Sequence, residues 1–386
     1  MTKTPDNISK KKFMEEFRRY QKGSVTRRHF LNVTGLGAAS AVLGSAVPGL
    51  RPSPAFAAGE IGDRVILATW PNYHDPANFD AFTEATGAHV QVNVFGSNEE
   101  MLAKLQAGGS GWDVYVPTNY TITTYVSEDL IEPLDTARLP NYDPSAFDPR
   151  YAEAGSVDGT LYAVPKNWGT TGYAVNTSHT DGKAMTSWKD FFDMTMDSFS
   201  GRTMVHDYQL TTIGNALKYF GYSFNSVAEN ELADAEKLLI DAKPHLFAIS
   251  SDYQPSMRNG DAWMTMCWTG DGKQLNTDMP EIAYVLGVEG GELWSDYYAI
   301  PKGAPHMDAA YALINFLLDP EVNAKEVLAH GYPSADAHTN KLLPEDLLND
   351  PILYPAADLL NALEFGAAVT LTDPNRAELM ARFKSA

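Results

Sequence analysis

Aromatic and acidic side chains follow most of the predicted strands of this chain. In an open α/β sheet, ligands bind beyond the carboxyl ends of the strands, so residues placed there converge on one region. Aromatic ring faces attract an organic cation by about 0.5–2 kcal/mol each, and carboxylates accept strong hydrogen bonds from ammonium groups. The set contains no Lys or Arg and therefore predicts a site for a small organic cation. Its members are Trp70, Tyr73, Thr118, Tyr120, Asp207, Trp268, Asp271, Trp294 and Asp296.

Each of these residues also has a structural explanation. A tryptophan after a strand commonly packs in a core. Asp207 could cap a helix that begins near Thr211, and Asp271 could belong to a turn at residues 269–272. Their joint placement at strand ends favours a binding site over these separate explanations.

The elements that must position this set alternate between strands and helices. Such alternation with short connections is the pattern of an open α/β layer. A Ser97–Glu100 capping box predicts a helix that runs to Ala107, and Gly87 predicts the end of the helix before it. Strands are expected at 65–69, 90–94, 113–116, 203–205, 246–250, 262–267 and 297–300, with a crossover between lobes at 161–165; helices are expected at 78–86, 97–107, 211–220, 229–242, 308–318 and 321–329.

The N-terminal region is typical of a twin-arginine export signal. Arg27 and Arg28 precede a short apolar run at 30–47, and Ala55-Phe56-Ala57 is a small-x-small cleavage site. We expect residues 1–57 to be removed near Ala57 after export by the twin-arginine translocase, which releases the product into the periplasm. The alternative is an uncleaved membrane anchor, although the run is short for a bilayer span.

Composition narrows the class of protein further. Residues 1–57 hold 10 of the 29 basic and 3 of the 49 acidic residues, so the remainder carries a net charge of −27. This balance excludes nucleic acid as an expected partner, because no basic surface remains to neutralise phosphates. About 330 residues exceed one usual core, so two lobes are expected. The single cysteine, Cys267, lies in an apolar run and is expected to be a buried small hydrophobe.

Motifs for catalysis or for cofactors are absent from the expected mature chain. It contains no nucleophile elbow, phosphate loop or dinucleotide fingerprint, and its histidines show no metal-ligand spacing. We therefore expect a protein that is not an enzyme, with no catalytic residue, no metal and no cofactor.

Seven segments, in order, resemble the spermidine/putrescine-binding branch of the bacterial periplasmic solute-binding proteins. They span nearly the whole expected mature chain, and their order carries more weight than any single motif. The segments are Trp70-Pro71-Asn72-Tyr73, Ser97-Asn98-Glu99-Glu100-Met101 with Lys104-Leu105, Asp113 to Tyr120, Trp268-Thr269-Gly270-Asp271, Gly290-Gly291 to Trp294-Ser295-Asp296, Ile314 to Leu318, and Gly331-Tyr332-Pro333.

This resemblance implies a two-lobed α/β periplasmic binding protein of the type II kind, with one ligand in the interlobe cleft. The N-terminal lobe would comprise residues 58–166 and 295–340, and the C-terminal lobe residues 167–294 and 341–386. A monomer would close over the ligand by a hinge and deliver it to an ABC permease. In that cleft the aromatic residues and Tyr332 would frame the ligand, Asp271 and Asp296 would pair with its ammonium groups, Thr118 would add a hydrogen bond, and Asp207 would match an acid of the opposite lobe.

Two departures from the polyamine pattern bear on the ligand. Leu210 stands where spermidine binders carry a Glu, and Gly366 stands where the family has a Gln. Losing an acid leaves one cationic end of spermidine without a partner, which is costly in a buried site. We therefore expect a ligand with fewer or differently spaced charges, such as putrescine or another amine, unless a neighbouring acid such as Asp207 takes over the pairing.

Two other classes of function remain as alternatives. The first is a secreted enzyme that acts on an amine, with Asp207 or His206 as base. The second is a protein of the same fold that binds an anionic or neutral solute, which the absence of Lys and Arg from the predicted set disfavours.

Overall fold

A mixed sheet of ten strands extends through residues 61–386, the part of the chain that this computed structural model describes. The twin-arginine motif and the cleavage site near Ala57 lie outside the described residues. The main path of the sheet is β2 (His89–Val94), β1 (Arg64–Thr69), β3 (Val114–Tyr115), β11 (Gly291–Ala299), β6 (Ala163–Asn176), β9 (Met264–Trp268), β7 (Thr203–Val205) and β8 (Leu246–Ile249), with β10 (Ile282–Val285) on β6 and β12 (Leu363–Phe365) on β11.

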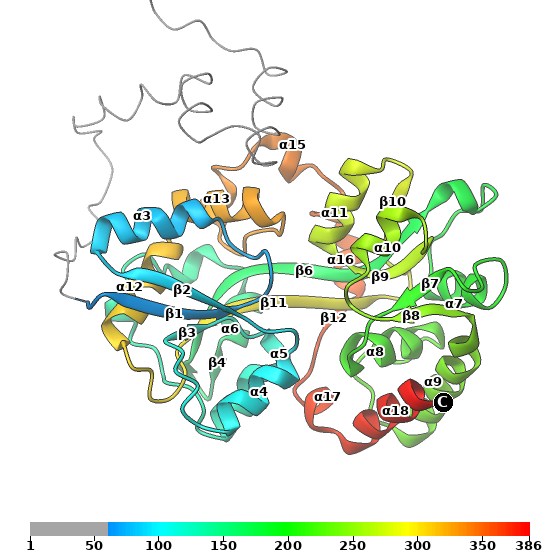
Figure 1. Cartoon of the computed structure of the whole chain (residues 1–386), viewed down its shortest axis with the longest axis horizontal. Helices are drawn as coiled ribbons and strands as arrows, with labels where there is room; N and C mark the ends of the chain where they lie inside the picture. The colour runs from blue at the N-terminus through cyan, green and yellow to red at the C-terminus, as the bar shows by residue number, and fades with distance from the viewer. Residues whose placement is uncertain (1–60) are drawn as a thin grey trace, which may run out of the picture. The chain divides into compact units, whose positions relative to one another are not determined.

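Two long antiparallel strands, β6 and β11, connect the two ends of this sheet (Figure 1). On one side, β3 joins β11 at Ala299, and β1 to β3 form the parallel sheet of the N-terminal lobe. On the other side, β9 joins β6 from Thr171 onward, and β7 to β9 form the parallel sheet of the C-terminal lobe. The predicted crossover at 161–165 is only the beginning of a longer one, and the predicted lobe boundaries at 166 and 294 fall inside these two strands.

Helices cover both lobes (Figure 1). Those of the N-terminal lobe are α3 (Pro76–Thr86), α4 (Asn98–Gln106), α5 (Asn119–Ser127), α12 (Met307–Leu317) and α13 (Pro320–His330), and the short α6 (Pro149–Ala154) precedes a small hairpin of β4 (Ser156–Val157) and β5 (Thr160–Leu161). Those of the C-terminal lobe are α7 (Trp188–Met196), α8 (Gln209–Tyr219), α9 (Glu229–Ala242), α10 (Gln254–Asn259) and α11 (Thr269–Asp278). The last part of the chain forms α14 (Ala337–Asn340), α15 (Glu345–Leu348), α16 (Ala357–Ala362), α17 (Val369–Thr372) and α18 (Pro374–Ser385).

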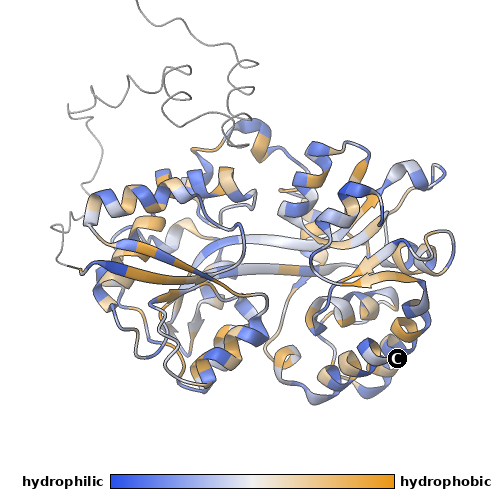
Figure 2. Ribbon diagram, viewed as in Figure 1, coloured by the Kyte–Doolittle hydropathy of each residue, from blue (hydrophilic) through white to orange (hydrophobic). Residues whose placement is uncertain are grey.

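Each lobe has its own apolar core. One contains Leu67, Val114 and Ile314, and the other contains Phe191, Met264 and Leu239. Figure 2 shows apolar residues on the strands of both lobes, whereas the crossing strands are mostly pale between the lobes. None of the described helices is long and apolar enough to cross a membrane.

The local sequence signals place most of these elements correctly. Gly87 ends α3 in the left-handed conformation, with φ of 81°, and the Ser97 hydroxyl accepts a hydrogen bond from the Glu100 backbone N–H at the start of α4. Cys267 is fully buried, as expected.

One local expectation is wrong, and two of the alternative structural explanations are excluded. Trp294 and Asp296 lie within β11, because pairing with β6 continues from Glu292 to Ala299. Asp271 lies in the first turn of α11 and not in an isolated turn. Asp207 does not cap α8, whose N-cap residue is Tyr208.

The buried carboxylate of Glu326 on α13 fixes the loop that follows β1. Glu326 is fully buried and accepts hydrogen bonds from the Asp75 backbone N–H at 3.0 Å and from Asn78 Nδ2 at 2.7 Å, and His74 Nδ1 lies 2.7 Å from its other oxygen. This loop also carries Trp70 and Tyr73, so α13 holds two predicted site residues in place.

We expect Glu326→Ala to lower the free energy of unfolding by about 3 kcal/mol, because it leaves His74, the Asp75 N–H and Asn78 buried without their acceptor. Chemical denaturation would measure the change. The control is Glu321→Ala, an exposed acid on the same helix, which should cost less than about 1 kcal/mol. Equal effects of the two variants would contradict the bracing role.

Candidate binding site

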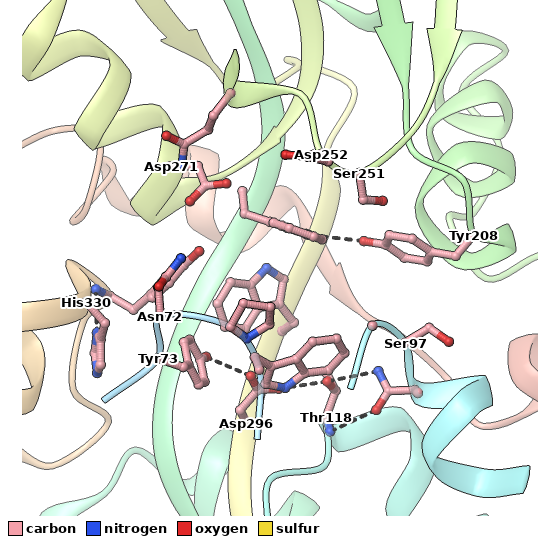
Figure 3. Close-up of a pocket in the computed structure, with 18 of the residues that line it drawn as sticks. Asn72, Tyr73, Ser97, Thr118, Tyr208, Ser251, Asp252, Asp271, Asp296 and His330 are labelled. Carbon is pink, nitrogen blue, oxygen red and sulfur yellow. Dashed lines mark hydrogen bonds between the residues drawn. The ribbon is translucent and has the colours of Figure 1, made fainter. Parts of the chain in front are cut away.

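A cavity of about 750 Å³ lies between the lobes, a size suited to a small organic molecule. Its walls come from the carboxyl ends of β1, β3 and β9, from β11, and from the segment after α13. In Figure 3, Asp271, Asp252 and Tyr208 lie across the cavity from Tyr73, Asp296 and Thr118. Nine of the ten predicted site residues line this cavity: Trp70, Tyr73, Thr118, Tyr120, Trp268, Asp271, Trp294, Asp296 and Tyr332.

The tenth residue, Asp207, lies outside this cavity. It is exposed, and its carboxylate accepts a hydrogen bond from Ser251 Oγ at 2.6 Å. It lines a neighbouring hollow that also includes Glu99, Glu100 and Lys384.

Asp296 is held by hydroxyl donors from the segments that follow β1 and β3, two neighbouring parallel strands of the N-terminal lobe. The Tyr73 hydroxyl donates to Oδ2 at 2.7 Å, and Thr118 Oγ1 donates to Oδ1 at 2.7 Å. Thr118 is held in turn by Asn98 Nδ2, which donates to it at 3.1 Å and to the Tyr120 hydroxyl at 2.8 Å. Each carboxylate oxygen has two acceptor positions, so capacity remains for a ligand.

Burial dominates the electrostatics of Asp296. Asp296 is only 5% exposed. Desolvation raises the pKa of its carboxyl group to about 6, despite the hydrogen bonds from Tyr73 and Thr118. An ionised carboxylate in such surroundings is stabilised most by an added cation.

Two further acids share this situation. Desolvation raises the pKa of Glu292 to about 7, although Thr171 Oγ1 and Thr211 Oγ1 donate to it at 2.6 and 3.0 Å. Desolvation also raises the pKa of Asp271, which accepts a hydrogen bond from the Tyr253 hydroxyl at 2.8 Å. Asp271, Glu292 and Asp296 therefore all accept hydrogen bonds from hydroxyl groups among the described residues, and Glu99 and Asp252 are the other acids of the lining.

Aromatic rings form the remaining walls, and glycine makes room for two of them. The rings of Trp294 and Tyr332 meet edge to face at a centroid distance of 5.3 Å. A Cβ on Gly169 would lie 2.4 Å from the Trp294 ring, and one on Gly270 would lie 2.7 Å from the Tyr332 ring. Both positions therefore require glycine for the rings to lie where they do.

The prediction missed several residues of the lining. Glu292 could have been found, because it alternates with Trp294 and Asp296 on one face of β11; the strand was expected to begin too late. Tyr208 precedes α8, and its hydroxyl accepts a hydrogen bond from Trp268 Nε1 at 3.1 Å and lies 2.6 Å from Thr211 Oγ1. The other missed members are Pro71, Asn72, Gly96, Ser97, Asn98, Glu99, Ser251, Asp252, Gln254, Pro255, Arg258, Gln274 and His330.

Arg258 corrects the expectation that the lining has no Lys or Arg. It is exposed, and its Nη1 donates to Asp278 Oδ2 at 2.6 Å, so its charge already has a partner. It was missed because α10, the short helix that carries it, was not predicted.

His206 lies outside the cavity lining. It is fully buried, stacks on Tyr208 and Tyr253, and has no hydrogen-bond partner for either ring nitrogen among the described residues. Desolvation lowers its pKa to about 3, so the ring is neutral.

Comparison with known proteins gives consistent matches. Spermidine/putrescine-binding periplasmic protein 1 of Haemophilus influenzae is 31% identical over 313 residues, which cover 80% of this chain and 86% of that protein. The putrescine-binding periplasmic protein SpuD of Pseudomonas aeruginosa is 30% identical over 309 residues, or 76% of this chain and 84% of that protein. The crystal structure of the spermidine/putrescine ABC transporter substrate-binding protein of Streptococcus pneumoniae superimposes with a TM-score of 0.71 at 28% identity, covering 84% of this chain and 99% of that one.

These matches confirm the expected two-lobed binding-protein fold. The model of one protein family, described as bacterial extracellular solute-binding protein, matches residues 77–352. The chain therefore belongs to the bacterial extracellular solute-binding proteins.

Proposed function

We propose that this protein captures a small organic amine in the interlobe cavity and delivers it to an ABC permease. The observation that carries the proposal is the pair of buried acids Glu292 and Asp296, with the half-buried Asp271, inside aromatic walls. Ammonium groups complement both features, because they donate charge-assisted hydrogen bonds and lie well on ring faces. The relatives named for spermidine and putrescine binding support the same chemistry.

Hinge motion about the crossing strands would open and close the cavity. The cavity is lined from both lobes, so a ligand that contacts both favours the closed state by its differential affinity. We propose that this closed monomer docks on the permease, and that export by the twin-arginine translocase and cleavage near Ala57 place it in the periplasm.

The structure gives the enzyme alternative little support. Of the two base candidates, Asp207 lies outside the cavity and His206 is buried beside it without access. The alternative of an anionic solute has only Arg258 among the lining residues, and Asp278 already neutralises that side chain.

The ligand is proposed to carry fewer charges than spermidine. Leu210 is 1% exposed and packs with Tyr120 and Phe224, and a Cβ on Gly366 would lie 3.1 Å from Leu210 and 3.3 Å from Tyr120. The two departures from the polyamine pattern therefore contact each other, and an apolar plug stands where an acid and an amide are expected. Neither residue lines the cavity, and the plug that they form behind Tyr120 supplies no partner for a further ammonium group.

A thermal-shift screen against amines, amino acids and sugars tests the proposed function. A ligand at about a hundredfold excess over its dissociation constant stabilises the folded protein by about 2.7 kcal/mol, and we expect such shifts with di- or polyamines.

Asp296→Asn should weaken amine binding by about 2 kcal/mol or more, because it removes a buried charge partner. The matched control is Asp80→Asn, at an exposed position on α3. This variant should bind amines as the wild type does. Shifts only with sugars or amino acids would overturn the assignment.

Competition between putrescine and spermidine tests the proposed charge preference. We expect putrescine to displace a fluorescent amine at lower concentration, because the plug formed by Leu210 and Gly366 offers no partner for a third ammonium. A clear preference for spermidine would defeat this part of the proposal and leave amine binding intact.

A further inference from the structure

Lys166 is a buried lysine next to the amine cavity whose ammonium has no hydrogen-bond partner among the described residues. It is 1% exposed, and its Nζ lies 4.1 Å from the centroid of the Tyr73 ring. It is not itself part of the cavity lining. Burying an ammonium in this way is costly unless other charges compensate it.

A bulge in β6 explains how Lys166 reaches this position. Asp296 pairs with Asn167 and Tyr297 pairs with Pro165, which leaves Lys166 without a partner in the ladder. Consecutive strand residues normally point to opposite faces, but a bulge re-aims one of them. Here the consecutive residues Lys166 and Asn167 both contact Tyr73. The Lys166 ammonium lies over the Tyr73 ring, and Asn167 Oδ1 lies 2.8 Å from the Tyr73 hydroxyl.

The groups that face Lys166 come from three elements. Carboxylates of Asp296 on β11 and Glu326 on α13 favour its charge, whereas His74 and His330 lie in the same cluster. Burial lowers the pKa of Lys166 to about 8 against the pull of both carboxylates, so the side chain is mostly charged at neutral pH. Tyr73 lies between the charges, with its ring face toward Lys166 and its hydroxyl on Asp296.

We propose that Lys166 is a resident cation of the amine site that limits how many positive charges a ligand can bring. This inference rests on the proposed function. Lys166 offsets part of the negative charge of Asp296 from behind Tyr73, so each further ammonium group of a ligand meets a less negative cavity. It is thus a specificity-determining residue that acts through Asp296 and Tyr73 and does not touch the ligand.

The test compares Lys166→Met with the wild type for binding of putrescine and spermidine by calorimetry. Methionine has a similar length and no charge, so we expect affinity to rise for both amines and the spermidine-to-putrescine affinity ratio to rise roughly five- to tenfold. The control Lys325→Met removes the same charge from an exposed position on α13 and should leave the ratio unchanged. Lys166→Arg, which keeps the charge, should retain the wild-type ratio.

The outcomes separate this inference from the function on which it rests. An unchanged ratio in Lys166→Met, with both amines still bound, would overturn the resident cation alone. Absence of amine binding by the wild type would instead overturn the proposed function. Folding of each variant is checked by its melting temperature without ligand, and Lys166→Gln provides a second neutral variant for the same comparison.

Discussion

Two carboxylates taken out of water, Asp296 and Glu292, impose the constraint on which the rest of this structure depends, because their hydrogen-bond partners are hydroxyl groups. Burial works against their ionised forms, and the pKa values of Asp296 and Glu292 rise accordingly to about 6 and about 7. Hydroxyl donors from Tyr73, Thr118, Thr171 and Thr211 orient the two carboxylates without neutralising them. A bound cation would supply the missing charge, and this would favour its binding.

The strand β11 both connects the two lobes and carries acids of the cavity. β11 crosses between the lobes, and its alternate residues Glu292, Trp294 and Asp296 all face the cavity. Its neighbour β6 supplies Gly169, which leaves space for the Trp294 ring, and the bulge that turns Lys166 toward Tyr73. One of the two strands that connect the lobes therefore lines the site, and the other supports it.

Local sequence signals made the positions of most site residues predictable. Strand and helix patterns placed the residues after β1, β3 and β9, and nine of the ten predicted residues share one cavity. Glu292 was missed because the crossing strand was expected to begin at residue 297, and Arg258 was missed because six-residue α10 gives little periodicity. Lys166 could not be placed at all, since a bulge depends on pairing between segments far apart in the sequence.

Carbon-13 NMR of labelled glutamate side chains measures the pKa of the Glu292 carboxyl group directly. We would titrate the carboxyl group of Glu292, assigned with Glu292→Gln, in the free protein and in the presence of saturating putrescine. The account predicts that this group titrates near 7 in the free protein and at clearly lower pH with the diamine bound, because the ammonium stabilises its ionised form. An ordinary glutamate titration in both states would contradict the account, since no uncompensated acid would then be waiting for a cation.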